Sequence, residues 1–190
     1  ARQCGGCQIQ ALSYEKQLEY KNNKIRNNLL RIGGFTEEEL HMEPIIGMED
    51  PFCYRNKAQF PLGKNKEGKP ITGFYAGRTH TIIKNTECAL GVKENQKILE
   101  IILNYMKDYQ VEPYEEAEHK GLIRHVLIRK GFSTGQLMVC LVINENQLPK
   151  EEKLVQELCT VENMTSISLS VNKEKTNVIM GKKIRLLYGR

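Results

Sequence analysis

The chain has 190 residues, of which 40% are hydrophobic and 27% are charged, and its formal net charge is +5. This length can bury one sizeable core or two small ones, and the composition is that of a globular protein rather than a disordered or fibrous one. No apolar stretch approaches the roughly 20 residues of a membrane span, so we expect neither a transmembrane helix nor a secretory signal. Six cysteines are too few for a disulfide framework, which indicates a reducing, cytoplasmic compartment.

Basic residues are concentrated in two stretches. Residues 55–84 contain seven Lys or Arg and one Glu, and residues 171–190 contain six Lys or Arg and one Glu, so the rest of the chain is net acidic. Such segregation favours docking of a polyanion, because phosphate neutralisation is the usual source of nucleic-acid affinity. Two solvated lysine-rich surfaces would give the same pattern.

The first elements are a cysteine- and glycine-rich loop over residues 1–10 and a helix. Ser13 stands where an N-cap is expected, and apolar residues from Tyr14 to Leu30 recur at helical spacing until Gly33. Thr36 and Glu39 have the spacing of a capping box, which predicts a further short helical turn.

The next segment predicts strands. Over residues 51–61, apolar positions such as Ala58 and Phe60 alternate with polar positions such as Arg55 and Lys57, so one face would be basic and exposed to solvent. The turn-forming sequence of residues 64–70 separates this strand from two more, at 72–75 and 79–84.

The second half of the chain mixes helices and strands. A helical period appears between Val92 and Met106, and a second helix is predicted over residues 150–159. The acidic residues 112–118 are expected to form a solvated linker. Further strands are predicted at 122–130 and 136–144, which form a hairpin, and at 166–172 and 177–188. This order predicts an α+β fold: a mainly antiparallel sheet with flanking helices and an N-terminal cysteine-rich loop.

The sharpest local motif is the pair Cys4 and Cys7, separated by two glycines. This spacing lets two thiolates reach one metal ion or cluster, but it is also the spacing of a redox pair. Further metal ligands would come from Cys53 or Cys88, because Cys140 and Cys159 stand among apolar residues and are more typical of a core.

Several catalytic signatures are missing from the sequence. It contains two aspartates, Asp50 and Asp108, and no glycine-rich nucleotide-binding motif or nucleophile elbow. The histidines do not have the spacing of a metalloprotease motif. We therefore do not expect this chain to be a self-sufficient enzyme.

Five motifs in order give the chain a resemblance to a known family. They are CGGCQIQALSYEKQLEYK from Cys4, YRNKAQF from Tyr54, GFYAGRTHTII from Gly73, IRHVLIRKG from Ile123 and NKEKTNVIMGKKIRLLYG from Asn172. Together they resemble the RNA (uracil-5)-methyltransferase family, especially its members that modify ribosomal RNA, and they cover nearly the whole chain.

The resemblance implies a role and a domain organisation. Residues 1–34 correspond to the cysteine-rich, cluster-type loop and its helix, and residues 35–190 to the central α+β RNA-recognition domain. The family's TRAM domain and its S-adenosylmethionine-binding domain are expected to lie outside this chain. The resemblance implies that in the complete enzyme a cysteine thiolate attacks C6 of a flipped-out uridine, C5 is methylated from S-adenosylmethionine, and the C5 proton is then abstracted. None of the six cysteines matches the motif of that nucleophile, so the resemblance implies no catalytic residue in this chain and no activity of its own.

The resemblance also implies site residues. Cys4, Cys7 and Cys88 match ligands of the family's [4Fe-4S] cluster, whose remaining ligand would precede Ala1, so a zinc ion or an empty site are alternatives. We expect RNA contacts from cations and from groups that stack on bases. These residues are Tyr54, Arg55, Lys57, Arg78, His80, Arg124 and His125.

The leading hypothesis is thus the cluster-binding and RNA-recognition part of an S-adenosylmethionine-dependent 23S rRNA (uracil-5)-methyltransferase, acting as a monomer on ribosomal RNA and not on a membrane. One alternative is a stand-alone zinc or iron-sulfur RNA-binding module without catalysis. Another is a simple dithiol on an α+β domain with no preference for RNA over other polyanions.

Overall fold

A computed structural model describes residues 3–189, so Ala1, Arg2 and Arg190, which begin and end the expected domains, lie outside the described residues. The described chain divides into two compact units. One consists of Cys7–Pro51, and the other combines residues 3–6 with residues 52–189. The smaller unit therefore extends to Pro51, beyond the boundary at residue 34 that the sequence suggests.

The smaller unit contains helix α1 (Tyr14–Arg31). The Ser13 side chain accepts a hydrogen bond from the Lys16 backbone N–H at 3.3 Å, which confirms Ser13 as the N-cap. Thr36 and Glu39 bond reciprocally: the Thr36 N–H donates to the Glu39 carboxylate at 2.9 Å, and the Glu39 N–H donates to the Thr36 hydroxyl at 3.4 Å. The expected capping box is present.

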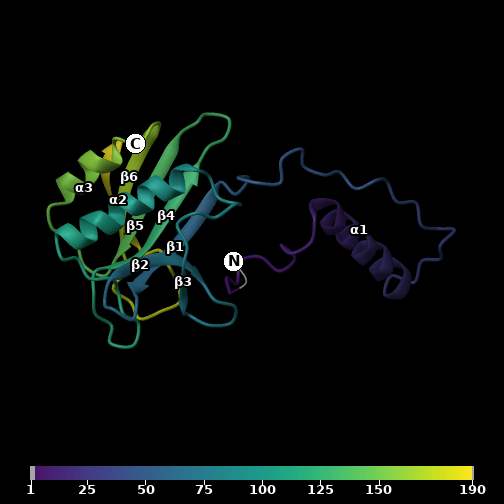
Figure 1. Cartoon of the computed structure of the whole chain (residues 1–190), viewed down its shortest axis with the longest axis horizontal. Coiled ribbons are helices and arrows are strands. Elements are labelled where there is room, and N and C mark those ends of the chain that lie inside the picture. Colours follow the sequence, from purple (N-terminus) through teal and green to yellow (C-terminus); the bar gives the residue numbers. More distant parts are fainter. Residues whose placement is uncertain (1–2, 190) are drawn as a thin grey trace. The chain divides into compact units, whose positions relative to one another are not determined.

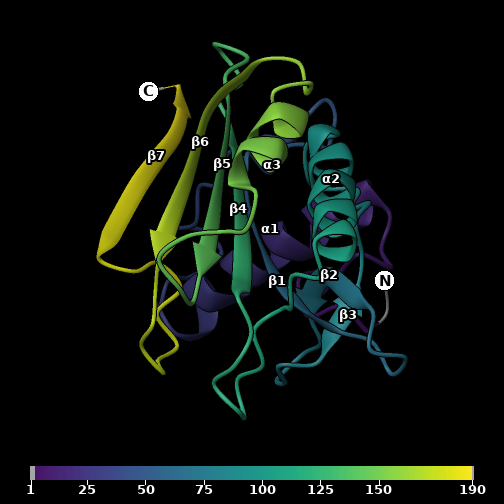
Figure 2. The ribbon, with the colours of Figure 1, turned by 90° about the vertical axis from the view of Figure 1, so that its left-hand side faces the viewer.

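The larger unit (Figure 1) is built on a seven-stranded sheet in the order β3-β2-β1-β4-β5-β6-β7, which can be followed in Figure 2. Its helices are α2 (Glu94–Asp108) and α3 (Glu151–Leu158). Its strands are β1 (Lys57–Lys64), β2 (Pro70–Tyr75), β3 (Ile82–Lys84), β4 (Ile123–Lys130), β5 (Leu137–Ile143), β6 (Met164–Val171) and β7 (Lys183–Gly189).

The sheet is antiparallel except at one pair. The hairpin of β4 and β5 is confirmed, with Val126 opposite Leu141. β5 and β6 instead run parallel, joined through α3, because a strand can return in the same direction only after a crossover. The α+β fold with a mainly antiparallel sheet is therefore confirmed.

The main core lies between the sheet and its two helices, which cover the same face (Figure 2). Phe60 of β1, Ile128 of β4 and Leu141 of β5 are at most 1% exposed and pack in one cluster with Ile98 and Leu154 of the helices. Burying side chains of this size contributes about 1.5–3 kcal/mol each, which holds the helices to the sheet.

The opposite face of the sheet is covered in part by a loop. Leu127, Cys140 and Val142 form a small second cluster, against which Ile179 and Met180 pack. The strand expected over residues 177–188 begins only at Lys183, because the segment before it forms this loop. No helix within residues 3–189 is both long and apolar enough to cross a membrane.

Candidate nucleic-acid interface

The turn between β2 and β3 places the first site residues. Its base is closed by the Ala76 N–H, which donates to the Thr81 carbonyl at 2.8 Å, and Arg78 at its tip takes a φ of 62°. The N-terminal segment pairs with this turn: Cys4 forms a bridge with Ala76, and the Gly5 N–H donates to the Tyr75 carbonyl at 3.0 Å. The basic stretch of residues 55–84 therefore folds back on itself at this turn.

Two rings stack across this turn. The ring centroids of Tyr75 and His80 lie 5.0 Å apart with an angle of 18° between the planes. His80 Nδ1 lies 2.7 Å from Oε2 of Glu116, which belongs to the acidic segment. Burial raises the pKa of Tyr75 to about 12, and the nearby Glu116 carboxylate adds to the shift while Arg124 opposes it. Tyr75 therefore keeps its hydroxyl proton at physiological pH.

The sequence predicts a solvated linker for the acidic segment of residues 112–118, but in the structure this segment forms a wall of the site. The Tyr114 N–H donates to the Ile123 carbonyl at 2.9 Å, and the Tyr114 side chain is buried. Gly121 permits the close return of the chain: it takes a φ of 90°, and a Cβ there would lie 2.1 Å from the Pro113 carbonyl oxygen. This pairing positions Glu116 toward the β2–β3 turn.

Arg124 is buried at 5% exposure, although sequence reasoning placed it among the residues that contact RNA. One of its terminal nitrogens donates to the carbonyls of Asn172 and Glu174 at 2.9 and 2.8 Å. Its guanidinium carbon lies 4.3 Å from the centroid of the Tyr114 ring. Arg124 thus holds the loop after β6, which carries part of the second basic stretch.

His125 follows Arg124 on β4, where the strand is irregular between Ile123 and His125, and both side chains line the same cavity. Its Nδ1 atom is buried and has no hydrogen-bond partner within residues 3–189. Burial lowers the pKa of His125 to about 4, and the positive charge of Arg124 lowers it further than the Glu116 carboxylate raises it. The imidazole is therefore neutral at physiological pH.

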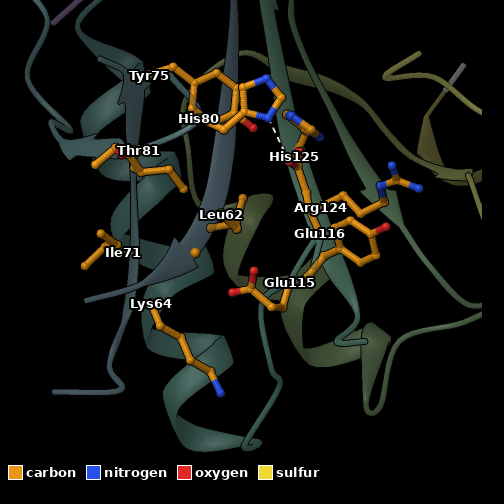
Figure 3. Close-up of a pocket in the computed structure, with 13 residues that line it drawn as sticks. Leu62, Lys64, Ile71, Tyr75, His80, Thr81, Glu115, Glu116, Arg124 and His125 are labelled. Atoms are coloured by element: carbon orange, nitrogen blue, oxygen red, sulfur yellow. Dashed lines mark hydrogen bonds and ion pairs between the residues drawn. The ribbon is translucent and has the colours of Figure 1, made fainter. Parts of the chain in front are cut away.

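These side chains surround a cavity of about 270 Å³, which we call the histidine pocket (Figure 3). Figure 3 shows the rings of Tyr75 and His80 lying over each other, with His125 beside them. A smaller adjoining cavity of about 110 Å³ shares five of these residues and is closed by Thr176, Asn177, Val178 and Ile179. The two basic stretches, which are far apart in the sequence, therefore meet at this pocket. It is lined by Leu62, Gly63, Lys64, Ile71, Tyr75, His80, Thr81, Ile82, Tyr114, Glu115, Glu116, Arg124 and His125.

The other expected RNA-binding residues lie at the far end of β1. Tyr54 and Lys57 are exposed, and the Arg55 N–H donates to the Leu90 carbonyl at 2.8 Å just before the strand begins. The pocket is at the opposite end of this strand, near Lys64, roughly 20 Å away at about 3.4 Å per residue. The expected residues thus fall into two groups.

Sequence reasoning missed several residues of these groups. Lys57 lies directly opposite the exposed Arg129 of β4, and two like charges at such a position concentrate positive potential. Tyr75, Tyr114 and Glu116 were missed at the pocket. A tyrosine five residues before His80 across a glycine-containing turn was a readable signal, whereas nothing local indicates that Glu116 faces His80.

The expected cluster ligands are distributed over both units. Throughout the part of the chain that the structure describes, no three His, Cys, Asp or Glu side chains are placed to hold a metal ion. Cys4 lies beside the β2–β3 turn, Cys88 lies in the loop before α2, and Cys7 belongs to the smaller unit. The cluster therefore stays a prediction from the family resemblance.

Several known proteins are similar to this chain over nearly its whole length. An uncharacterized RNA methyltransferase of Clostridium tetani is 42% identical over 188 residues, which cover 98% of this chain and 40% of that protein. Uncharacterized RNA methyltransferases of Clostridium acetobutylicum and Staphylococcus aureus are 39% and 38% identical, each with 41% of its length covered. No family model matches the chain.

A solved structure shares the fold. The tRNA (uracil-54, C5)-methyltransferase of Pyrococcus abyssi, in complex with S-adenosyl-L-homocysteine, superimposes with a TM-score of 0.72 at 25% identity. The alignment covers 98% of this chain and 41% of that protein. This chain belongs to the RNA methyltransferase family. It spans about two fifths of the length of the relatives it matches.

Proposed function

We propose that this chain is the RNA-recognition part of an S-adenosylmethionine-dependent enzyme that methylates C5 of a uridine in 23S ribosomal RNA, in the cytoplasm and as a monomer. The single observation that carries the proposal is the meeting of the two basic stretches at the histidine pocket, in a chain about 40% identical to RNA methyltransferases over 98% of its length. An RNA-recognition surface needs cations for phosphates and flat groups for unstacked bases, and both occur here.

The two groups of residues would contact different parts of the RNA. Arg55, Lys57 and the exposed Tyr54 would form one contact at the start of β1, and His80 and His125 of the pocket would form the other together with Arg78 at the tip of the β2–β3 turn. Arg124 acts in this proposal by positioning the loop over residues 172–176 rather than by touching phosphate. An RNA strand that reaches both groups would lie along β1.

The chemistry of methyl transfer is not assigned to this chain. S-adenosylmethionine supplies the methyl group in the proposed reaction, and we assign no residue here to its binding. Cys140 is buried, and burial raises its thiol pKa, which disfavours the thiolate form that a nucleophile needs. Cys159, which the sequence suggests for the core, is exposed at the end of α3. We propose that the chain alone binds RNA and transfers no methyl group.

The iron-sulfur cluster stays a prediction from the family resemblance and is not part of the proposed function. Cys4, Cys7 and Cys88 are its expected ligands, and the described arrangement does not bring three ligands together. Iron, sulfide and zinc analysis of the chain purified without oxygen would test it. Stoichiometric iron and sulfide would support the cluster, and their absence would contradict it.

Binding of RNA at increasing salt tests the proposed function. Fragments of 23S rRNA and a tRNA transcript are titrated with the chain in a series of potassium chloride concentrations. Affinity for the rRNA should exceed that for tRNA, and log K should fall linearly with log salt because bound cations displace counterions. Affinity that is weak or independent of salt would contradict the phosphate contacts.

A further inference from the structure

We propose that the histidine pocket binds one unpaired guanine base of the RNA, at a position other than the uridine to be methylated. This inference rests on the proposed function and adds a base preference to it. Three features support a guanine site: the stacked rings of Tyr75 and His80, the carboxylate of Glu116, and Nδ1 of His125, which has no partner within residues 3–189.

The stacked pair of Tyr75 and His80 offers a flat surface for a base. The two rings are nearly parallel, and the His80 side chain is 59% exposed, so one ring face is open. Because Tyr75 is neutral at physiological pH, its ring presents no phenolate charge to the base. Unstacked bases bind such aromatic surfaces whatever their identity, so stacking supplies affinity without choosing the base.

Glu116 provides the selectivity for guanine over the other bases. Its Oε2 atom lies 2.7 Å from His80 Nδ1, and the side chain is 53% exposed, so the carboxylate can accept further hydrogen bonds. An ionised carboxylate only accepts hydrogen bonds, so it favours a base edge that carries donors. The Watson–Crick edge of guanine presents two adjacent donors, N1–H and the N2 amino group. Adenine and cytosine present one amino group beside an acceptor, and the single imino group of uracil lies between two carbonyl oxygens that a carboxylate repels.

His125 supplies a second polar contact in the same cavity. Buried polar atoms are nearly always paired with protein, water or ligand, so Nδ1 of His125, which has no partner within residues 3–189, is available to a polar group that enters the cavity. The neutral imidazole can donate from one nitrogen and accept at the other, which suits the O6 and N7 acceptors of guanine or a bridging water.

The size and rim of the pocket agree with a single nucleotide. A cavity of about 270 Å³ is at the small end of ligand sites, which fits a base rather than a whole cofactor. Lys175 lines a neighbouring hollow that shares Glu116 and Arg124, so a cation is placed for the phosphate of the bound nucleotide. Arg124 holds this loop in position through the carbonyl of Glu174.

The test measures base preference with matched RNAs. Fluorescence anisotropy compares four labelled single-stranded 12-nucleotide RNAs: all uridine, or uridine with one central guanine, adenine or cytosine. We expect the guanine RNA to bind about tenfold more tightly than the all-uridine RNA. Glu116→Gln should reduce this preference to less than about twofold, since the amide presents a donor as well as an acceptor. Glu118→Gln, an exposed residue of the same segment outside the pocket, should keep it.

The outcomes separate the pocket from the proposed function. Equal binding of the four RNAs with steep salt dependence would overturn the guanine site and leave RNA recognition standing. A preference that survives in Glu116→Gln would also overturn it.

A second readout keeps the test decisive if no RNA binds. NMR signals of the His80 and His125 rings should shift on addition of guanosine monophosphate and shift far less with uridine monophosphate. The ring of His41, in the smaller unit, serves as the internal control. Unchanged His80 and His125 signals would overturn the guanine site.

Discussion

His80 and Glu116 lie 36 residues apart in the sequence, yet His80 Nδ1 is 2.7 Å from Glu116 Oε2. The contact joins the β2–β3 turn to the acidic segment before β4, so the two walls of the histidine pocket are held by one hydrogen bond. Both side chains are more than half exposed, and the bond itself contributes little stability. The geometry of the pocket therefore depends mainly on the buried groups around it.

Arg124 is the buried group with the largest expected effect on stability. Arg124→Met removes hydrogen bonds to three carbonyls of the 172–176 loop and the contact with the Tyr114 ring, while keeping much of the side-chain volume. We expect the free energy of unfolding to fall by about 3 kcal/mol in urea titrations. Arg129→Met, at an exposed position of the same strand, should change it by less than about 0.5 kcal/mol. Equal losses in the two variants would contradict the role of Arg124.

His125 should make stability depend on pH. Its pKa is lowered to about 4 in the folded chain, so between pH 6.5 and 4 the unfolded chain binds more protons than the folded one. Stability is therefore highest above pH 6.5 and decreases as pH falls to about 4, by roughly 3 kcal/mol for this group.

Two measurements check this pH dependence. The His125 ring signals should stay those of a neutral imidazole at pH 5.5 in an NMR titration. His125→Gln should lose most of the decrease in unfolding free energy between pH 7 and pH 5. A His125 ring that protonates near pH 6.5 would show that the side chain is not desolvated.

The N-terminal segment should depend on Gly5. A Cβ at this position would lie 3.0 Å from the Gly77 backbone nitrogen and Cα, tighter than ordinary contacts, so Gly5→Ala should push the segment away from the β2–β3 turn. The amide of residue 5, which donates to the Tyr75 carbonyl, should then exchange with solvent at least about tenfold faster. Gly6→Ala meets only the Cys4 sulfur at 3.5 Å and is the matched control. Identical exchange in both variants would contradict the pairing.

The basic residues at the start of β1 should determine part of the salt dependence of RNA binding. Arg55→Gln and Lys57→Gln should each lower the slope of log K against log salt by about 0.7 on single-stranded RNA, because each removes one phosphate contact. Lys107→Gln, an exposed change in the last turn of α2, should leave the slope unchanged. If the three variants behave alike, this end of β1 does not contact phosphate.

Much of the fold could be predicted from the sequence because capping residues and the periodicity of apolar residues indicate helices and strands locally. The N-cap at Ser13, the helical period around Ile98 and the alternation at Ala58 and Phe60 all correspond to the observed elements. The parallel pairing of β5 and β6 could not be read, since strand direction depends on the path of α3 and not on residue pattern.

The candidate site was less accessible to sequence reasoning. Arg124 and His125 are adjacent in a strand, yet an irregularity of β4 between Ile123 and His125 lets both line the histidine pocket, and their burial depends on segments far away in the sequence. The acidic residues around Glu116 resemble a linker by composition, and only pairing of Tyr114 with Ile123 places them at the pocket. The concentration of basic residues in 55–84 and 171–190 predicted a surface for a polyanion, but it did not indicate that these two stretches meet.

Ultraviolet cross-linking of the chain to a 23S rRNA fragment, with the modified peptides identified by mass spectrometry, tests the central claim most directly. The account predicts cross-links in the β2–β3 turn that contains His80, in residues 113–125 and around Tyr54 at the start of β1. Cross-links confined to the outer surfaces of α2 and α3 would contradict the proposal that the histidine pocket and the start of β1 recognise RNA.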